Sequence, residues 1–259
     1  MTGRPVGDVV RYDVVRRVAW LTINRPEARN ALSQEVRDAL FTGFRRFAED
    51  GEAAALVLTG TGDAAFCAGG DLREMADTAL TVPPPDFVPQ LGRNLMVDKP
   101  VIGAVNGIAY GGGFLLVQQC DLVIAADNAR FAVTEARLGR GSPWAVPLSG
   151  LVGPRIAMQL LITGEPISAH RAYEVGLVNQ VVPLAGLYEA AQSLGERIAA
   201  NAPLSVMAAK RTVGLLADHP LEEAYELAEQ MWAPVYRSAD AQEGPAAFRD
   251  KRHPIWTGQ

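Results

Sequence analysis

The stretch KPVIGAVNGIAYGGGFLLVQQCD, at residues 99–121, decides the fold of this chain. Residues 101–105 form a short apolar run after a proline, which is typical of a buried strand. An Asn-Gly pair then breaks the strand, and a glycine triplet at 111–113 opens a segment that predicts a helix. The first N–H groups of a helix have no partner inside it, so this arrangement aims free amides at a ligand. The stretch therefore predicts a backbone site for a carboxylate, a phosphate or a polarised carbonyl oxygen.

A second glycine turn, AFCAGGDLRE at residues 65–74, has the same layout. It follows a predicted strand, and Asp71 lies near the start of the next predicted helix. A single glycine run is a weak signal, because three glycines can serve close packing alone. Two such turns together can place two N–H groups on one oxygen, which favours a functional interpretation.

Length and composition exclude several classes of protein. The chain has 259 residues, is 49% hydrophobic and carries a formal net charge of −5. This length allows a large α/β core, and neither the charge nor any basic run indicates a nucleic-acid partner. The two cysteines, Cys67 and Cys120, fit neither a disulfide framework nor a zinc site. We interpret both as core residues, although Cys67 lies close enough to the second turn to be considered as a nucleophile.

The N-terminal residues lack the apolar region of a signal peptide, and no apolar run reaches the roughly 18 residues that span a membrane. We therefore expect a cytoplasmic protein without a membrane segment. Strands and helices alternate through residues 1–182, whereas residues 183–259 are almost entirely helical in pattern. A helical extension without its own core often packs on a neighbouring subunit, so we expect an oligomer.

Local patterns predict the individual elements. Residues 14–23 read as a strand, and Ser33 is the expected N-cap of a helix over 34–50 whose apolar positions fall at helical spacing. The prolines of residues 81–89 predict a surface loop, and residues 87–97 are predicted as a helix. Further helices are predicted at 155–161, 169–175, 187–200, 204–216, 221–237 and 241–248.

The two glycine turns, in this order and with these flanks, resemble the crotonase family, which contains the enoyl-CoA hydratases and isomerases. The resemblance covers nearly the whole chain and is highly specific. Its matching segments are NRPEARNALS at 24–33, AFCAGGDL at 65–72, KPVIGAVNGIAYGGG at 99–113, CDLVIAADNARF at 120–131, ITGEPISAHRAYEVGLVNQVV at 162–182 and AFRDKRHPIW at 247–256.

This resemblance implies an α/β fold built as a crotonase-type spiral of ββα units, followed by a C-terminal helical trimerisation region. It implies a homotrimer or a hexamer made of two trimers, an acyl-CoA thioester substrate, and neither a metal nor a redox cofactor, since coenzyme A is part of the substrate. The amides of Gly70 and Gly112 would form an oxyanion hole for the thioester oxygen. The implied substrate-binding residues are Glu27, Ala28, Arg29, Ala68, Asp71, Leu72, Leu115 and Trp144.

The chain departs from the hydratases of the family at one catalytic position. Those enzymes carry two glutamates, and the first, in a GGGxE motif, is replaced here by Leu115. The second is kept as Glu135, which makes it the expected catalytic carboxylate. One carboxylate suits proton transfer from C2 to C4 of a 3-enoyl thioester, and the single-glutamate isomerases of the family are similar to this chain on that point. The departing segment LGRGSPWAVP, with Trp144, is expected to reshape the acyl pocket.

Three alternatives remain at this point. A 2-enoyl-CoA hydratase is possible if Glu74, Asp77 or Asp86 supplies a second acid from the loop. A protein that binds CoA or a partner without catalysis is a second alternative. A serine hydrolase is disfavoured, because no G-x-S-x-G motif is present and all the histidines lie in the helical C-terminal third.

Overall fold

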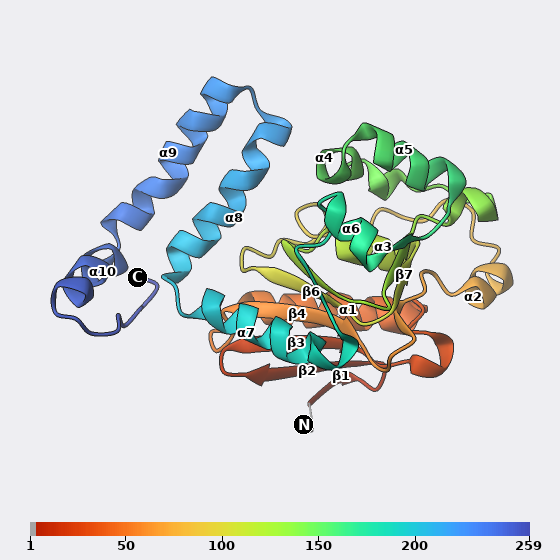
Figure 1. Cartoon of the computed structure of the whole chain (residues 1–259), viewed down its shortest axis with the longest axis horizontal. Coiled ribbons are helices and arrows are strands. Elements are labelled where there is room, and N and C mark those ends of the chain that lie inside the picture. The colour runs from red at the N-terminus through yellow and green to blue at the C-terminus, as the bar shows by residue number, and fades with distance from the viewer. Residues whose placement is uncertain (1–3) are drawn as a thin grey trace.

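A computed structural model describes residues 4–259, which form two sheets with helices around them (Figure 1). The larger sheet has the strand order β1-β2-β3-β4-β6-β8-β11, in which β3 onward are parallel neighbours. Its strands are β1 (Arg4–Gly7), β2 (Val10–Val15), β3 (Val18–Ile23), β4 (Ala55–Gly60), β6 (Val101–Val105), β8 (Leu122–Ala126) and β11 (Gln180–Val182).

The smaller sheet has the order β10-β9-β7-β5, with β9, β7 and β5 parallel. Its strands are β5 (Ala65–Cys67), β7 (Ile108–Tyr110), β9 (Arg130–Ala132) and β10 (Ile167–Ser168). The chain alternates between the sheets, because β4, β6 and β8 of the larger sheet are each followed directly by a strand of the smaller one. A helical segment follows each pair, so successive ββα units build the spiral that the sequence predicts.

Helix α1 (Gln34–Glu49) shows why the local pattern was informative. The Ser33 hydroxyl caps it by accepting a hydrogen bond from the Val36 amide at 3.4 Å. Leu40, Phe44 and Phe47 share its buried face, as the helical spacing predicts. The other α-helices are α2 (Leu72–Asp77), α3 (Gly112–Gln118), α4 (Leu148–Val152), α5 (Pro154–Thr163), α6 (Ala169–Glu174), α7 (Leu187–Ala199), α8 (Pro203–Asp218), α9 (Leu221–Arg237) and α10 (Ala239–Arg249).

Short 3-10 helices complete the backbone: η1 (Pro26–Ala28), η2 (Glu135–Leu138), η3 (Pro143–Ala145) and η4 (Leu184–Gly186). Within residues 4–259, no helix combines the length and the apolar character that crossing a bilayer requires.

Two apolar clusters hold the body together. The larger one joins α1, α3 and the two sheets, and includes Phe44, Phe66 and Phe114. The smaller one lies on the other face of the large sheet, where α7 packs against it through Leu187 and Ala191. Burial of these side chains is the main stabilising term of the fold.

Helices α8, α9 and α10 project to one side of the body (Figure 1). Two ion pairs attach α8 to it: Lys210 Nζ lies 2.8 Å from Asp121 Oδ2, and Arg211 lies 2.6 Å from Asp98. The C-terminal residues fold back onto α10, since the Ala239 amide donates to the Gln259 carbonyl. The C-terminal helices therefore extend away from the sheets.

Two local predictions were wrong. Residues 14–23 form parts of two strands, because Arg16 and Arg17 take positive φ angles of 48° and 65° in a turn between β2 and β3. Residues 87–97 are not helical. There the Asn94 side chain accepts a hydrogen bond from the Gln90 amide and donates to two carbonyls, and Gly92 has a φ of +80°. These local bonds satisfy the backbone in place of helical ones.

Candidate active site

The expected site lies at one edge of the smaller sheet. Gly70 follows β5, Gly112 follows β7 and Glu135 follows β9, and β7 lies between the other two strands. The three strands are parallel, so their carboxyl ends meet at the same edge. The topology therefore brings together three segments that are separated by dozens of residues in the sequence.

The two glycine turns touch each other. A methyl group on Gly112 would lie 3.7 Å from the Gly70 amide nitrogen, and one on Gly69 would lie 3.4 Å from the Gly112 nitrogen. Gly69 also has a φ of +98° and approaches the Tyr110 carbonyl so closely that a Cβ has no room. In the part of the chain that the structure describes, neither the Gly70 nor the Gly112 amide donates a hydrogen bond. Two free amides from separate turns are thus neighbours.

Glu135 lies beside the turn at Gly111 and Gly112. It is the first residue of η2, and a methyl group on Gly111 would lie 3.2 Å from its Oε1 atom. The Gly111 amide donates to the Ala132 carbonyl at the end of β9, at 3.0 Å, which fixes the turn against the strand that leads to the glutamate. The carboxyl group and the start of α3 are consequently in contact.

The surroundings of Glu135 favour its neutral form. Burial raises the pKa of this carboxyl above its ordinary value. Interactions with its own backbone, with the Trp144 side chain and with the Thr134 backbone oppose the rise of the pKa without cancelling it. The Oε2 atom is buried and has no hydrogen-bond partner in the described chain. A carboxyl with a raised pKa and a free oxygen is suited to accept and return a proton.

Helix α3, which begins at the turn beside this carboxyl group, and the nearby η3 carry apolar and aromatic side chains. Leu115, at the position of the missing glutamate, is 4% exposed in α3. The Trp144 ring, in η3, lies with its centroid 6.2 Å from that of Phe114. The Trp144 carbonyl accepts a hydrogen bond of 2.7 Å from Gln118 Nε2. Sequence reasoning missed Gln118, although its polar side chain in the otherwise apolar run FLLV was a visible signal.

The segment expected to hold coenzyme A also reaches this edge. The Ala68 amide donates to the Arg29 carbonyl at 3.0 Å, and the Leu32 amide donates to the Gly69 carbonyl at 2.8 Å. Glu27 and Arg29 are exposed, and within residues 4–259 no carboxylate pairs with the Arg29 guanidinium. The Arg29 guanidinium is thus free to bind an anion beside the turn at Gly69 and Gly70.

Of the two expected binding residues at the start of α2, Asp71 is engaged within the protein and Leu72 is exposed. The Asp71 carboxylate caps α2 and lies 2.6 Å from Arg25, whose hydrogen bond lowers the pKa of Asp71. Its oxygens are therefore already engaged within the protein. The Leu72 side chain is 55% exposed at the start of α2, where it can contact a bound ligand.

Glu74, considered above as a second acid, is tied down by structural partners. Its carboxylate lies 2.8 Å from the Arg37 guanidinium and accepts a hydrogen bond of 2.7 Å from the Gln34 amide. Arg37 in turn is buried and stacks on Phe87, 3.9 Å from the ring centroid. Asp77 and Asp86 are exposed. None of these acids is held beside Glu135 by a hydrogen bond.

Cys67 is a core residue, as predicted. It is fully buried in β5, and burial raises the pKa of its thiol to about 12, which disfavours the reactive thiolate. Cys120 is partly buried, its Sγ bonds to the Leu116 carbonyl, and burial likewise raises its pKa. Among residues 4–259, no group of three or more His, Cys, Asp or Glu side chains is arranged to hold a metal ion.

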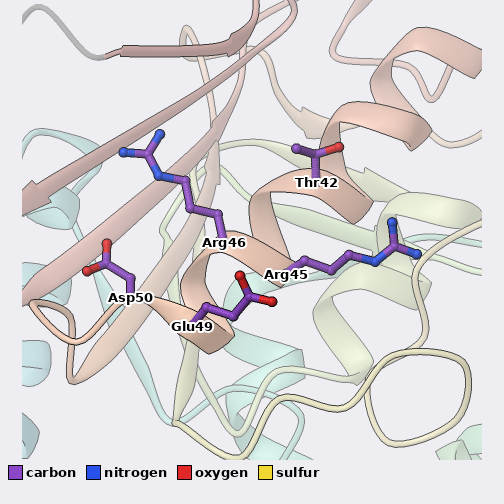
Figure 2. A pocket seen from close by; sticks show the side chains of 5 residues that line it. All are labelled: Thr42, Arg45, Arg46, Glu49 and Asp50. Atoms are coloured by element: carbon purple, nitrogen blue, oxygen red, sulfur yellow. The ribbon is translucent and has the colours of Figure 1, made fainter.

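A surface hollow lies elsewhere. A depression of about 650 Å³ runs along the C-terminal half of α1. Figure 2 shows the side chains that line it, which are Thr42, Arg45, Arg46, Glu49 and Asp50. Two of its charged groups have structural partners, because Asp50 accepts a hydrogen bond of 2.8 Å from the Tyr12 hydroxyl and Arg46 stacks on the Tyr12 ring. None of the predicted site residues lines this hollow.

Comparisons with known proteins agree with this geometry. Residues 14–259 match the model of the enoyl-CoA hydratase/isomerase family. An enoyl-CoA hydratase from Mycobacterium marinum superposes with a TM-score of 0.90 at 33% identity, over 98% of this chain and 100% of its own. An enoyl-CoA hydratase/isomerase from Mycobacterium paratuberculosis gives a TM-score of 0.88 at 35% identity, over 97% and 99% of the two chains. The fold and the site thus define a crotonase-type enzyme.

A curated relative, a carnitinyl-CoA dehydratase of Salmonella heidelberg (strain SL476), is 37% identical over 249 residues, which are 92% of this chain and 94% of that protein. The chain belongs to the enoyl-CoA hydratase/isomerase family, within the crotonase superfamily.

Proposed function

We propose that this enzyme converts a 3-enoyl-CoA into the conjugated 2-enoyl-CoA by moving one proton along the acyl chain. The observation that carries the proposal is the carboxyl of Glu135, which is buried beside the glycine turns and has a raised pKa. The buried Leu115 stands where the hydratases of the family have their other glutamate. A single carboxyl group can perform this reaction, because the proton that it takes is the proton that it returns.

The thioester oxygen would accept hydrogen bonds from the Gly70 and Gly112 amides. Removal of the C2 proton moves negative charge onto this oxygen, where two fixed donors stabilise it, each by about 3–4 kcal/mol. Glu135 then delivers the proton to C4 of the dienolate. A pKa above the ordinary value brings the carboxyl closer to the proton affinity of the dienolate, which helps both steps.

Coenzyme A would lie where the turn after β5 meets the end of η1, at the hydrogen bond between Ala68 and Arg29. Ala68, Glu27 and Ala28 would line the adenine, and the unpaired guanidinium of Arg29 would meet a phosphate. Leu72 and Trp144 would contact the pantetheine and the acyl chain. In this assignment Asp71 acts indirectly, because its bond to Arg25 holds the start of α2.

Removal of water from a 3-hydroxyacyl-CoA is a second candidate, favoured by the curated relatives named carnitinyl-CoA dehydratase. That reaction also passes through an enolate at the same oxygen. Glu135 would take the C2 proton and deliver it to the departing hydroxyl group, so that one carboxyl again serves both steps.

One experiment separates the two reactions. The purified protein is incubated with 3-enoyl-, 2-enoyl- and 3-hydroxyacyl-CoA of several chain lengths, and the products are followed by absorbance of the conjugated thioester and by mass spectrometry. Isomerisation gains absorbance without a change of mass, whereas dehydration loses 18 mass units. Absence of turnover on every 3-enoyl thioester would contradict the first proposal.

We also propose that residues 183–259 assemble the protein into a homotrimer or a dimer of trimers, with the acyl site in residues 1–182. Apolar side chains on the projecting helices support it, since burying them on another copy is favourable. The exposed ones are Val213, Leu216, Leu221, Tyr225, Tyr236 and Phe248. A monomeric mass in light scattering would contradict this assembly.

A further inference from the structure

Two buried side-chain atoms of the described chain lack any hydrogen-bond partner, and both lie around Trp144. They are Oε2 of Glu135 and Oε1 of Gln118. The Trp144 carbonyl accepts from Gln118 Nε2, and the Trp144 side chain lies close enough to the Glu135 carboxyl to lower its pKa. An unpaired acceptor in the interior costs about 1–3 kcal/mol, so each of these atoms calls for a donor.

The orientation of the Gln118 amide is fixed by its neighbour. Its Nε2 lies 2.7 Å from the Trp144 carbonyl oxygen. Rotating the amide by half a turn would set two oxygens at that distance, and both are acceptors. The free atom is therefore the oxygen, and it can only accept a hydrogen bond.

Gln118 also lies on the correct face of its helix. It follows Leu115 by three residues and Phe114 by four in α3, so the three side chains share one side of the helix. Phe114 contacts the Trp144 ring on that side. Leu115 stands on this face in place of the missing glutamate. The amide oxygen of Gln118 is thus a polar atom on the same face, one turn further along α3.

We propose that Gln118 determines substrate specificity, with its Oε1 accepting a hydrogen bond from a hydroxyl group on the acyl chain. This inference rests on the proposed function, in that the acyl chain must lie beside Glu135 and Trp144. The substrate class is then hydroxylated acyl-CoA thioesters, because an unsubstituted alkyl chain leaves the amide oxygen unpaired. A hydroxyl group donates one hydrogen to Gln118 and removes that cost.

The test measures binding and needs no turnover. Calorimetric titration compares butyryl-CoA with 4-hydroxybutyryl-CoA on the wild type and on Gln118→Met, which keeps the length of the side chain and removes the acceptor. The same comparison is made with 3-hydroxybutyryl-CoA in the Glu135→Gln background, so that the ligand is not consumed. We expect the wild type to bind at least one hydroxylated thioester about 3–10-fold more tightly than butyryl-CoA, the effect of one hydrogen bond.

Gln118→Met is expected to lose this preference while its affinity for butyryl-CoA changes less than about twofold. Gln119→Met is the matched control, because the Gln119 amide bonds only to the Leu91 amide and the Pro89 carbonyl. Gln118→Leu also removes the acceptor and should also lose the preference, which supplies a second variant if the methionine protein does not fold.

Equal preference in the wild type and Gln118→Met would overturn the inference and would assign Oε1 to an internal water. If the wild type binds none of these CoA thioesters, both this inference and the proposed function are overturned. An intact preference without isomerisation of a 3-enoyl-CoA would overturn only the proposed reaction.

Discussion

Replacing Glu135 by glutamine keeps the shape of the side chain and removes its ability to accept a proton. In residues 4–259, the carboxyl group nearest to a methyl group placed on Gly111 is that of Glu135, so we expect no other group to substitute for it. A positioned acid–base group contributes about 10²–10⁴-fold to a rate. We therefore expect kcat to fall by about that factor, which corresponds to about 3–5 kcal/mol in the activation barrier.

The same substitution should not destabilise the protein. Burial raises the pKa of Glu135, so the folded state binds a proton more tightly than the unfolded state does. Folding stability therefore falls as the pH rises from the ordinary glutamate pKa through the raised one. At neutral pH the buried charge is a cost, and glutamine removes it. We expect the Tm of Glu135→Gln to equal or exceed that of the wild type at pH 7, and the difference to vanish below about pH 4.

The pH profile gives an independent readout. The base must be ionised, so kcat/KM of the wild type should rise with pH through an apparent pKa above the ordinary glutamate value. Isomerisation is followed by absorbance of the conjugated thioester, and retained affinity for butyryl-CoA is checked by calorimetry. Glu174→Gln is the control, because that exposed residue pairs only with Arg171 on the surface. A Glu135→Gln protein with more than a tenth of wild-type kcat, or with a lower Tm, would refute the reasoning.

Four further predictions follow from the same geometry. Gly111→Ala should lower kcat at least tenfold and stability by about 1–2 kcal/mol, because its φ is +51° and the new methyl meets Glu135; thermal unfolding and the isomerase assay measure both. Arg37→Leu should cost about 2–4 kcal/mol in urea unfolding, since it leaves the Glu74 carboxylate without its buried partner; an unchanged midpoint argues against that ion pair. Arg29→Ala should weaken binding of CoA thioesters about 3–10-fold without changing Tm. Calorimetry with dephosphorylated analogues checks this, because the wild type and Arg29→Ala should bind them with equal affinity. Hydration of a 2-enoyl-CoA should be at least tenfold slower than isomerisation, and fast hydration would reveal a water-activating group other than Glu135.

Much of the fold follows from short-range signals in the sequence. The strand at Val101–Val105 and the helix at Leu221–Arg237 have the predicted bounds, because an apolar run and a 3.6-residue period mark them without tertiary help. Ser33 was predictable as a cap because its hydroxyl serves the helix that it begins. The spiral itself came from the resemblance, since no local pattern states that alternate strands enter different sheets.

The rest of the site depends on contacts that no local pattern contains. The bond between Gln118 and the Trp144 carbonyl joins residues 26 positions apart, and it exists only because η3 packs against α3. Arg37 and Glu74 meet across 37 positions, which removed Glu74 from consideration as a mobile acid. The failed helix at 87–97 is the opposite case, where the Asn94 side chain outcompetes an otherwise adequate helical pattern.

The pairing of two glycine amides has an evolutionary consequence. Those donors belong to the main chain and need no particular side chain, but the turn that presents them requires glycine at Gly69, where a Cβ has no room. The glutamate and the wall around Trp144 are side chains and can each change through a single codon. Under the proposed function, new chemistry on a thioester can arise here through changes of those side chains, while the glycine turns are kept.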